Sequence, residues 1–269
     1  MYLLNVSCAR TKLNPERYPL SNTVCKNCSQ RFEGAFCNNC GQDARVRRID
    51  STYIVDEVTN NLFQLNRGLF FTMKRLALKP GDSIKEFLEG KRKQYVKPLS
   101  YVLVTSALYV LTTFFLGLNT FFQDFTEGFT SGVTDEGDAV AAAILNILTW
   151  LTNNHTYTVL LTLPLFSAAS YLAFKRSRYN YFEHLILNMY ITGQQMLIYL
   201  LSSFTVVEDS ITEAIPSLLG IAFSFWAFYQ FFRNHKPFVR ILLTILTYVL
   251  FFIQIIALMS LGVVLVKVI

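Results

Sequence analysis

Long apolar stretches separated by short charged loops constrain this chain more than any other feature of its sequence. A helix needs about 20 mainly apolar residues to cross a bilayer; five stretches have about that length or more. The five are Pro98–Leu118, Thr156–Phe174, Phe182–Val207, Ala214–Phe232 and Ile241–Val266. Only 16% of the residues are charged, against about 25% in a typical soluble domain. The sequence therefore predicts an all-α polytopic membrane protein with about five transmembrane helices.

The charges of the connecting loops predict the orientation of these spans. Basic residues gather in two short loops, at 175–178 and 233–240, whereas residues 119–155 and 207–213 carry acids and no Lys or Arg. Basic loops stay on the cytosolic side of a membrane. Five spans place both basic loops there, with a cytosolic N-terminus and a periplasmic C-terminus. The stretch Ala139–Leu151 is too short to span, so we expect an interfacial or re-entrant helix, or the first part of a long bent second span.

Four cysteines near the N-terminus form two Cys-x2-Cys pairs that predict a metal site. Cys25 and Cys28 make the first pair, and Cys37 and Cys40 make the second. Each pair offers two thiolates from one tight turn, so the two pairs complete a tetrahedral site for one structural Zn²⁺. Such a site folds a segment that is too small to fold alone. A redox pair of Cys-x2-Cys motifs and a rubredoxin-like iron site are the alternatives.

The residues around the cysteines support a zinc ribbon. Gly41 directly follows the last cysteine, where the turn often needs a positive φ, and the first pair has Ser29 at the equivalent position. We expect Phe32 and Phe36 to cover the site, and the remaining cysteine, Cys8, to be a free thiol.

The chain divides into four parts on this basis. We predict a disordered leader at residues 1–22, a zinc ribbon at 23–45, cytosolic amphipathic and juxtamembrane helices at 46–97, and a membrane domain at 98–269.

Residues 51–90 show the periodicity of helices that lie next to a membrane. Five apolar residues recur at intervals of three and four, as on one amphipathic face. They are Ile54, Val58, Leu62, Leu65 and Leu69. Such a helix either lies in the headgroup region or packs on its neighbours. After the break at Pro80-Gly81, a capping-box pattern at Ser83–Glu86 predicts a second helix that ends at Gly90.

Four basic residues directly precede the first span. They are Lys91, Arg92, Lys93 and Lys97. A basic residue at this place contributes on the order of 1 kcal/mol to the attraction of an anionic leaflet. We therefore expect them to contact anionic lipid headgroups. No nucleic acid is expected as a partner, because no separate fold presents these residues to a duplex.

The order of the motifs matches that of a known family. The matching features are Cys40-Gly41-Gln42 at the end of the ribbon, Lys79-Pro80-Gly81, Gly90-Lys91-Arg92, Tyr95, Pro98, and Tyr181 with Glu183-His184. With these features the chain resembles the bacterial membrane family catalogued as domain of unknown function 3667. The resemblance implies a location in the bacterial inner membrane and brings no known activity. A weaker likeness to Yip1-type proteins rests on the five-span topology alone.

The third span carries a stripe of polar residues along one helix face. Its members are His184, Asn188, Thr192, Gln195, Tyr199 and Ser202. The stripe either lines a pathway or packs helices together, because uncharged polar residues commonly form hydrogen bonds between spans. No Lys, Arg, Asp or Glu falls in the central part of any span, which argues against an ion-coupled transporter.

Two function classes fit these features. The sequence has no nucleophile elbow, zinc-protease motif or phosphate loop, so we do not expect an enzyme. The leading hypothesis is a membrane adaptor, or an assembly or scaffold protein, whose zinc ribbon binds a protein partner. The alternative is a carrier or channel for a neutral or lipid-like molecule that uses the polar stripe.

Overall fold

The computed structural model describes residues 23–60, 68–119, 123, 139–204 and 210–268, and it is mostly helical. Two short strands, β1 (Thr23–Val24) and β2 (Arg31–Phe32), pair antiparallel with Thr23 opposite Phe32. The helices are α1 (Ser51–Asn60), α2 (Leu69–Leu78), α3 (Pro80–Glu89), α4 (Pro98–Leu116), α6 (Ala139–Asn153), α7 (His155–Ala173), α8 (Tyr181–Ser202), α9 (Ser210–Phe231) and α10 (Pro237–Val268). The expected leader with Cys8, and Leu62 and Leu65 of the amphipathic face, lie outside the described residues.

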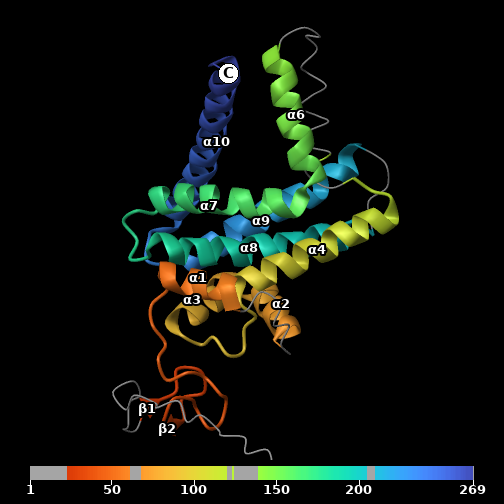
Figure 1. Ribbon diagram of the computed structural model, residues 1–269. Helices are drawn as coiled ribbons and strands as arrows, with labels where there is room; N and C mark the ends of the chain where they lie inside the picture. The colour runs from red at the N-terminus through yellow and green to blue at the C-terminus, as the bar shows by residue number, and fades with distance from the viewer. Residues whose placement is uncertain (1–22, 61–67, 120–122, 124–138, 205–209, 269) are drawn as a thin grey trace, which may run out of the picture.

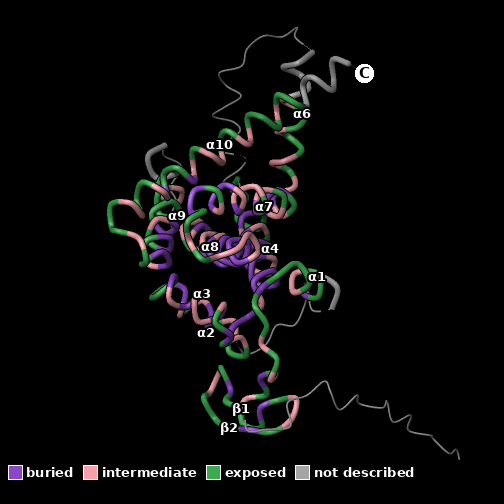
Figure 2. Tube along the Cα trace, turned by 90° about the vertical axis from the view of Figure 1, so that its left-hand side faces the viewer, coloured by how far each residue is buried: buried purple, intermediate pink, exposed green. Residues whose placement is uncertain are grey.

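Helix α8 is the centre of the fold, because α4, α7 and α9 all pack against it. It runs in the same direction as α4: the Tyr101 hydroxyl donates to Gln194 at 2.6 Å, and further along the ring of Tyr109 lies 6.0 Å from that of Tyr199. Helices α7 and α9 run the opposite way, so the basic loops 174–180 and 232–236 lie at the same end (Figure 1). Figure 2 shows buried residues concentrated in α4 and α8.

Helices α6 and α10 leave this layer. Both rise from it, and α10 crosses α7 steeply instead of running along it (Figure 1). The ring of Phe166 in α7 meets those of Tyr248 and Phe251 in α10 at 5.3 and 5.2 Å. Helix α6 ends at Asn153 and α7 begins at His155 in a new direction. The alternative of one long bent second span is therefore not what the structure contains.

Three of the described helices are long and apolar enough to cross a membrane. They are α4, α7 and the part of α10 at Pro237–Leu261; a shorter apolar helix covers Ile215–Phe231. These helices indicate a membrane protein. All five predicted spans form helices. Over their described residues, however, neither α8 nor α9 is both long and apolar enough, so length and hydropathy support three spans.

Local sequence signals fix several helix ends. Pro98 occupies the first turn of α4, where its missing N–H group is not needed, and Gly117 ends that helix with φ 66°. The Asn180 side chain accepts a hydrogen bond from the Glu183 N–H group, while the Glu183 carboxylate accepts one from the Asn180 N–H group. Gly90, with φ 117°, ends α3 as predicted.

The start of α3 differs from the predicted one. The helix begins at Pro80, because a proline suits the first turn, and not at Ser83. The Ser83 hydroxyl lies within hydrogen-bonding distance of the carbonyl oxygens of Lys79 and Arg75, at 2.7 and 3.1 Å. Ser83 thus ties the end of α2 to α3 and does not cap a helix.

Helix α3 packs closely on α9 at Gly81. A Cβ atom at this position would lie 2.4 Å from the backbone nitrogen of Phe231. Backbone atoms move aside less easily than a flexible side chain, so we expect Gly81→Val to lower the free energy of unfolding by about 2 kcal/mol. Thermal unfolding in lipid nanodiscs measures this, with Ala77→Val at an exposed position of α2 as the control. Equal melting temperatures for the two variants would contradict the expectation.

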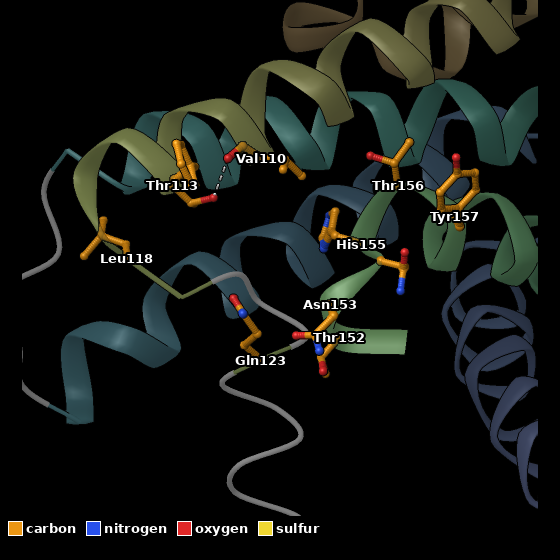
Figure 3. Close-up of a pocket in the computed structure, with 11 residues that line it drawn as sticks. Val110, Thr113, Leu118, Gln123, Thr152, Asn153, His155, Thr156 and Tyr157 are labelled. Carbon is orange, nitrogen blue, oxygen red and sulfur yellow. Dashed lines mark hydrogen bonds between the residues drawn. The ribbon is translucent and has the colours of Figure 1, made fainter. Parts of the chain in front are cut away.

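A cavity of about 370 Å³ opens at the end of the fold where α4 finishes and α6 meets α7 (Figure 3). Its lining includes Thr113 from α4 and His155 from the start of α7.

Candidate metal centre and its contacts

Two matching turns build the cysteine cluster. In the first, the Ser29 N–H group donates to the Cys25 carbonyl at 2.8 Å; in the second, the Gly41 N–H group donates to the Cys37 carbonyl at 2.8 Å. Both turns have a positive φ after the second cysteine, 63° at Ser29 and 70° at Gly41. Ser29 adopts a conformation that favours glycine, so the two pairs are equivalent in shape despite the different residues.

The four sulfur atoms lie where one metal ion could bind them all. The Sγ atoms of Cys25, Cys28, Cys37 and Cys40 lie within 4.8 Å of one another. Cys25 and Cys40 are 3.5 Å apart, and Cys28 and Cys37 are 3.6 Å apart. A tetrahedral site with Zn–S bonds of about 2.3 Å needs sulfur atoms about 3.8 Å apart. The four thiols are therefore close to the geometry of a closed tetrahedral site, and a metal ion would hold them together.

The two phenylalanines near the cluster lie differently. Phe32 is buried against the cysteines, as predicted, whereas the side chain of Phe36 is 60% exposed. The expectation that Phe36 covers the site is therefore wrong. Its backbone forms an isolated bridge with Asp43, and this pairing turns the side chain outward.

The cluster rests on the turn that follows α3. The Lys93 N–H group donates to the Gln42 side-chain oxygen at 3.0 Å, and Arg92 donates to the Arg47 carbonyl at 2.7 Å. The Arg92 guanidinium also lies over the rings of Tyr53 and Phe87, at 4.9 and 5.6 Å.

The basic residues before the first span are thus partly engaged within the chain. Arg92 is half-buried by the contacts above, and Lys91 pairs with Glu86 at 3.4 Å. Lys93 is exposed and Lys97 is half-buried. The expected contact with anionic headgroups stays a prediction, with Lys91 and Lys93 the two exposed members of the four.

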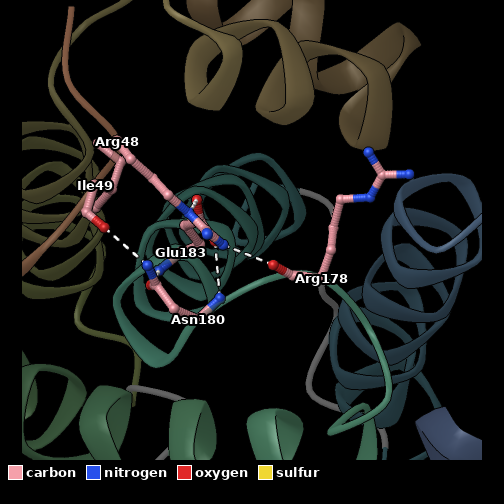
Figure 4. A network of polar contacts seen from close by, with 5 residues as sticks. All are labelled: Arg48, Ile49, Arg178, Asn180 and Glu183. Atoms are coloured by element: carbon pink, nitrogen blue, oxygen red, sulfur yellow. Dashed lines mark hydrogen bonds and ion pairs between the residues drawn. The ribbon is translucent and has the colours of Figure 1, made fainter.

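An ion pair ties the segment after the cysteine cluster to α8 (Figure 4). The Arg48 guanidinium donates to both carboxylate oxygens of Glu183, at 2.8 and 2.7 Å, and to the Arg178 carbonyl at 2.6 Å. The Asn180 side chain donates to the Ile49 carbonyl at 3.0 Å. The Glu183 side chain is only 7% exposed, and it also closes the start of α8. This pair was not predicted, because its partners are 135 residues apart.

A second buried carboxyl lies at the start of α4. Glu57 in α1 is 3% exposed and accepts a hydrogen bond from the Leu99 N–H group at 2.9 Å. Burial raises the pKa of Glu57 to about 7; the Leu99 bond, Lys97 and other neighbours oppose that shift. Glu57 therefore supports the start of α4 from another helix.

The first two members of the polar stripe, His184 and Asn188, meet serines of α7. His184 Nδ1 lies 3.0 Å from Ser170 Oγ, and the Asn188 amide donates to Ser170 and Ser167 at 3.0 and 3.2 Å. All four residues are buried. At this end, the stripe forms hydrogen bonds between α7 and α8.

The other members lie in less uniform surroundings. The Gln195 amide donates to the Gly220 carbonyl in α9 at 2.9 Å, and Tyr199 is buried. Thr192 is half-buried, and the Ser202 hydroxyl donates to a carbonyl of its own helix. These contacts are of the kind that helix packing requires, and the role of the stripe stays a prediction.

One comparison with known proteins gives a match. A sequence model of the family described as "Protein of unknown function (DUF3667)" matches residues 66–110, which include α2, α3 and much of α4. No curated protein and no solved structure gives a significant match to the chain, and nothing supports the Yip1 likeness. The expected resemblance to domain of unknown function 3667 is therefore confirmed, over residues 66–110.

Proposed function

We propose that the chain is a membrane adaptor or assembly protein that holds a zinc ribbon in a fixed place beside its membrane helices. The observation that carries this proposal is the Arg48–Glu183 pair, because it joins the ribbon's connecting segment to the central helix α8. The Gln42–Lys93 contact adds a second attachment. A ribbon held at two points presents its outer surface in one orientation, as a docking module needs.

The outer surface of the ribbon suits a protein partner. Val24 and Phe36 are 54% and 60% exposed, although the ribbon is small and has few apolar side chains to bury. Exposed apolar residues of this kind gain most by burial against another protein. No enzyme activity is proposed. On the membrane side, the anionic headgroups of a bacterial inner membrane are the partners we propose for the basic residues.

Affinity purification from native membranes tests the adaptor role. We expect a stoichiometric protein partner to be retained by the wild type and lost with Phe36→Ser. Phe70→Ser is the matched control, because Phe70 is equally aromatic and 82% exposed but lies on α2. If no protein is retained, or if both variants behave alike, the ribbon is not the docking surface.

Arg48→Ala is expected to loosen the ribbon without removing its metal. The change leaves the buried Glu183 carboxylate without its guanidinium partner, although its bond to the Asn180 N–H group remains. Hydrogen bonds to charged groups contribute about 1.5–3 kcal/mol; because Arg48 is 60% exposed, we expect about 2 kcal/mol.

Hydrogen–deuterium exchange of residues 46–50 measures the loosening, and zinc content measures metal retention. Arg47→Ala, at the neighbouring exposed arginine, is the control. Unchanged exchange in Arg48→Ala would show that the ion pair does not hold the ribbon.

We further propose five spans with a cytosolic N-terminus. The directions of α4, α7, α8 and α9 support this, because they bring the basic loops 174–180 and 232–236 to one end. Spanning helices tilt by about 40° at most, so α10 becomes a fifth span only by turning at residues 232–236.

A topology reporter tests the five-span proposal. A reporter fused after Ile269 should be active on the periplasmic side, and one inserted after Arg176 in the first basic loop should be active in the cytosol. A cytosolic signal from the C-terminal fusion would rule out five spans.

A further inference from the structure

The cavity at the end of α4 has two chemically different walls. Figure 3 shows α4 on one side and the α6–α7 corner on the other. The α4 wall is mainly apolar, with Val110, Phe114 and Leu118 beside one hydroxyl, that of Thr113. The opposite wall is polar along its whole length. It consists of Thr152, Asn153, Asn154, His155, Thr156 and Tyr157.

Among the described residues that line this cavity, which also include Gln123, none is Asp, Glu, Lys or Arg. Amide, hydroxyl and imidazole groups both donate and accept hydrogen bonds, so this wall suits a ligand with several hydroxyl groups and no charge. A charged ligand would lose its hydration without gaining a partner of opposite charge among these residues. The volume of about 370 Å³ is also within the range of small-molecule sites, about 300–1,000 Å³.

We propose that this cavity binds a neutral, hydroxyl-rich ring, such as a sugar, that is either free or the headgroup of a lipid. Such a ring has one face of C–H groups and a rim of hydroxyls. The C–H face matches the α4 wall, where the Phe114 ring, 77% exposed, stands at the edge of the cavity. The hydroxyl rim matches Asn153, Asn154 and Thr156. The site stands independently of the adaptor role, because it shares no residue with the ribbon.

Trp150 can serve as an intrinsic fluorescent probe for this site. Trp150 lies one helical turn before the lining residue Asn154, and its carbonyl accepts a hydrogen bond from the Asn154 amide at 2.8 Å. The measurements use the Trp226→Phe variant. Because the chain has two tryptophans, Trp150 is then the only one left. The protein is placed in nanodiscs of phosphatidylglycerol and phosphatidylcholine, so that no detergent competes.

Three probes are titrated against the Trp150 signal: glucose, a bromoalkyl glucoside that quenches tryptophan on contact, and alkyl phosphate with a chain of the same length. We expect saturable binding of a neutral probe and at least tenfold weaker binding of the phosphate. Binding of glucose itself identifies a free sugar as the source, whereas binding of the alkyl glucoside alone identifies a lipid headgroup. Absence of binding by both neutral probes, or equal binding of the phosphate, overturns the proposal.

Two matched pairs of variants locate the binding site. Thr113 lines the cavity, whereas the half-buried Thr112 does not; each hydroxyl also bonds to a carbonyl of its own helix. We expect Thr113→Val to weaken binding of the neutral probe on the order of fivefold, and Thr112→Val to leave it within twofold.

The second pair compares neighbouring exposed rings. Phe114 lines the cavity and Phe115, 79% exposed, does not. Phe114→Ala should weaken binding at least fivefold while Phe115→Ala does not. Because Phe114 is exposed, its replacement tests the site even if Thr113→Val fails to fold. Equal effects within both pairs would show that the probe binds elsewhere, and the proposal would be wrong.

Discussion

Purified protein is expected to contain about one zinc ion per chain and to lose it when Cys37 or Cys40 is replaced by serine. Each replacement removes one of four thiolates whose Sγ atoms lie within 4.8 Å, and a neutral hydroxyl is a poor substitute for a thiolate. A structural zinc ion contributes about 10–16 kcal/mol of apparent binding free energy in ribbon-sized peptides. This is the largest effect we expect of any substitution in the chain, since it includes most of the ribbon's folding energy.

Metal analysis measures the zinc, and limited proteolysis of residues 23–45 measures the fold of the ribbon. Cys8→Ser is the control, because Cys8 lies outside the two Cys-x2-Cys pairs; it should change neither measurement. A visible absorption band with bound iron would assign the cluster to the rubredoxin-like alternative. Unchanged zinc content in both cysteine variants would mean that the four thiols do not form the site.

The parts of the fold that follow from local sequence could be predicted. The second apolar stretch was predicted at Thr156–Phe174 and forms α7 at His155–Ala173, because span length and hydropathy are properties of consecutive residues. The cysteine pairs likewise came together as predicted, since each pair is closed by a turn of a few residues. Gly90 ended its helix for the same local reason.

The features that depend on distant residues could not be predicted. Arg48 and Glu183 are far apart in sequence, and neither periodicity nor spacing connects them. The hydrogen-bond partners of His184 and Asn188 are serines of α7, whereas the sequence offered small and hydroxyl residues in every span. No pattern in the sequence predicts the steep crossing of α10 over α7, because the crossing angle depends on how the side chains of the two helices fit together.

The family model matches one continuous segment of the chain and not the distant contacts. It covers residues 66–110 and leaves out the cysteine cluster and the Arg48–Glu183 pair. Within the matched segment, Tyr95 and Arg75 both bond to Glu86, at 2.8 Å each. These contacts hold the turn that receives the ribbon, so the matched segment is the base on which the ribbon sits.

Glu57 should make the protein less stable as the pH rises from about 4.5 to about 7. Its pKa is raised from an ordinary value of 4.5 to about 7, mainly by burial. Between these values the folded protein keeps a proton that the unfolded chain has released, so the free energy of unfolding falls with rising pH. Since one pKa unit corresponds to about 1.4 kcal/mol, the loss amounts to about 3 kcal/mol and is complete above pH 7.

Glu57→Gln should remove this dependence and stabilise the protein at pH 8. A glutamine side chain carries no charge to bury, and its carbonyl oxygen can still accept the hydrogen bond from the Leu99 N–H group. Subtracting the stability of the variant from that of the wild type at each pH cancels all other titrating groups. Thermal unfolding in nanodiscs from pH 4 to pH 8 gives this difference.

Asp56→Asn is the matched control, because Asp56 is an exposed acid on the same helix. Its difference from the wild type should stay within about 0.5 kcal/mol at every pH, as for other surface substitutions. The expectation is wrong if the wild type is as stable as Glu57→Gln at pH 8, or if its stability relative to the variant increases as the pH rises. Either result would mean that the Glu57 carboxylate is stabilised in the fold. In that case the hydrogen bond from Leu99 and the charges of Lys97 and Arg92 would outweigh the cost of burial, and Glu57 would act as an ionised cap for α4.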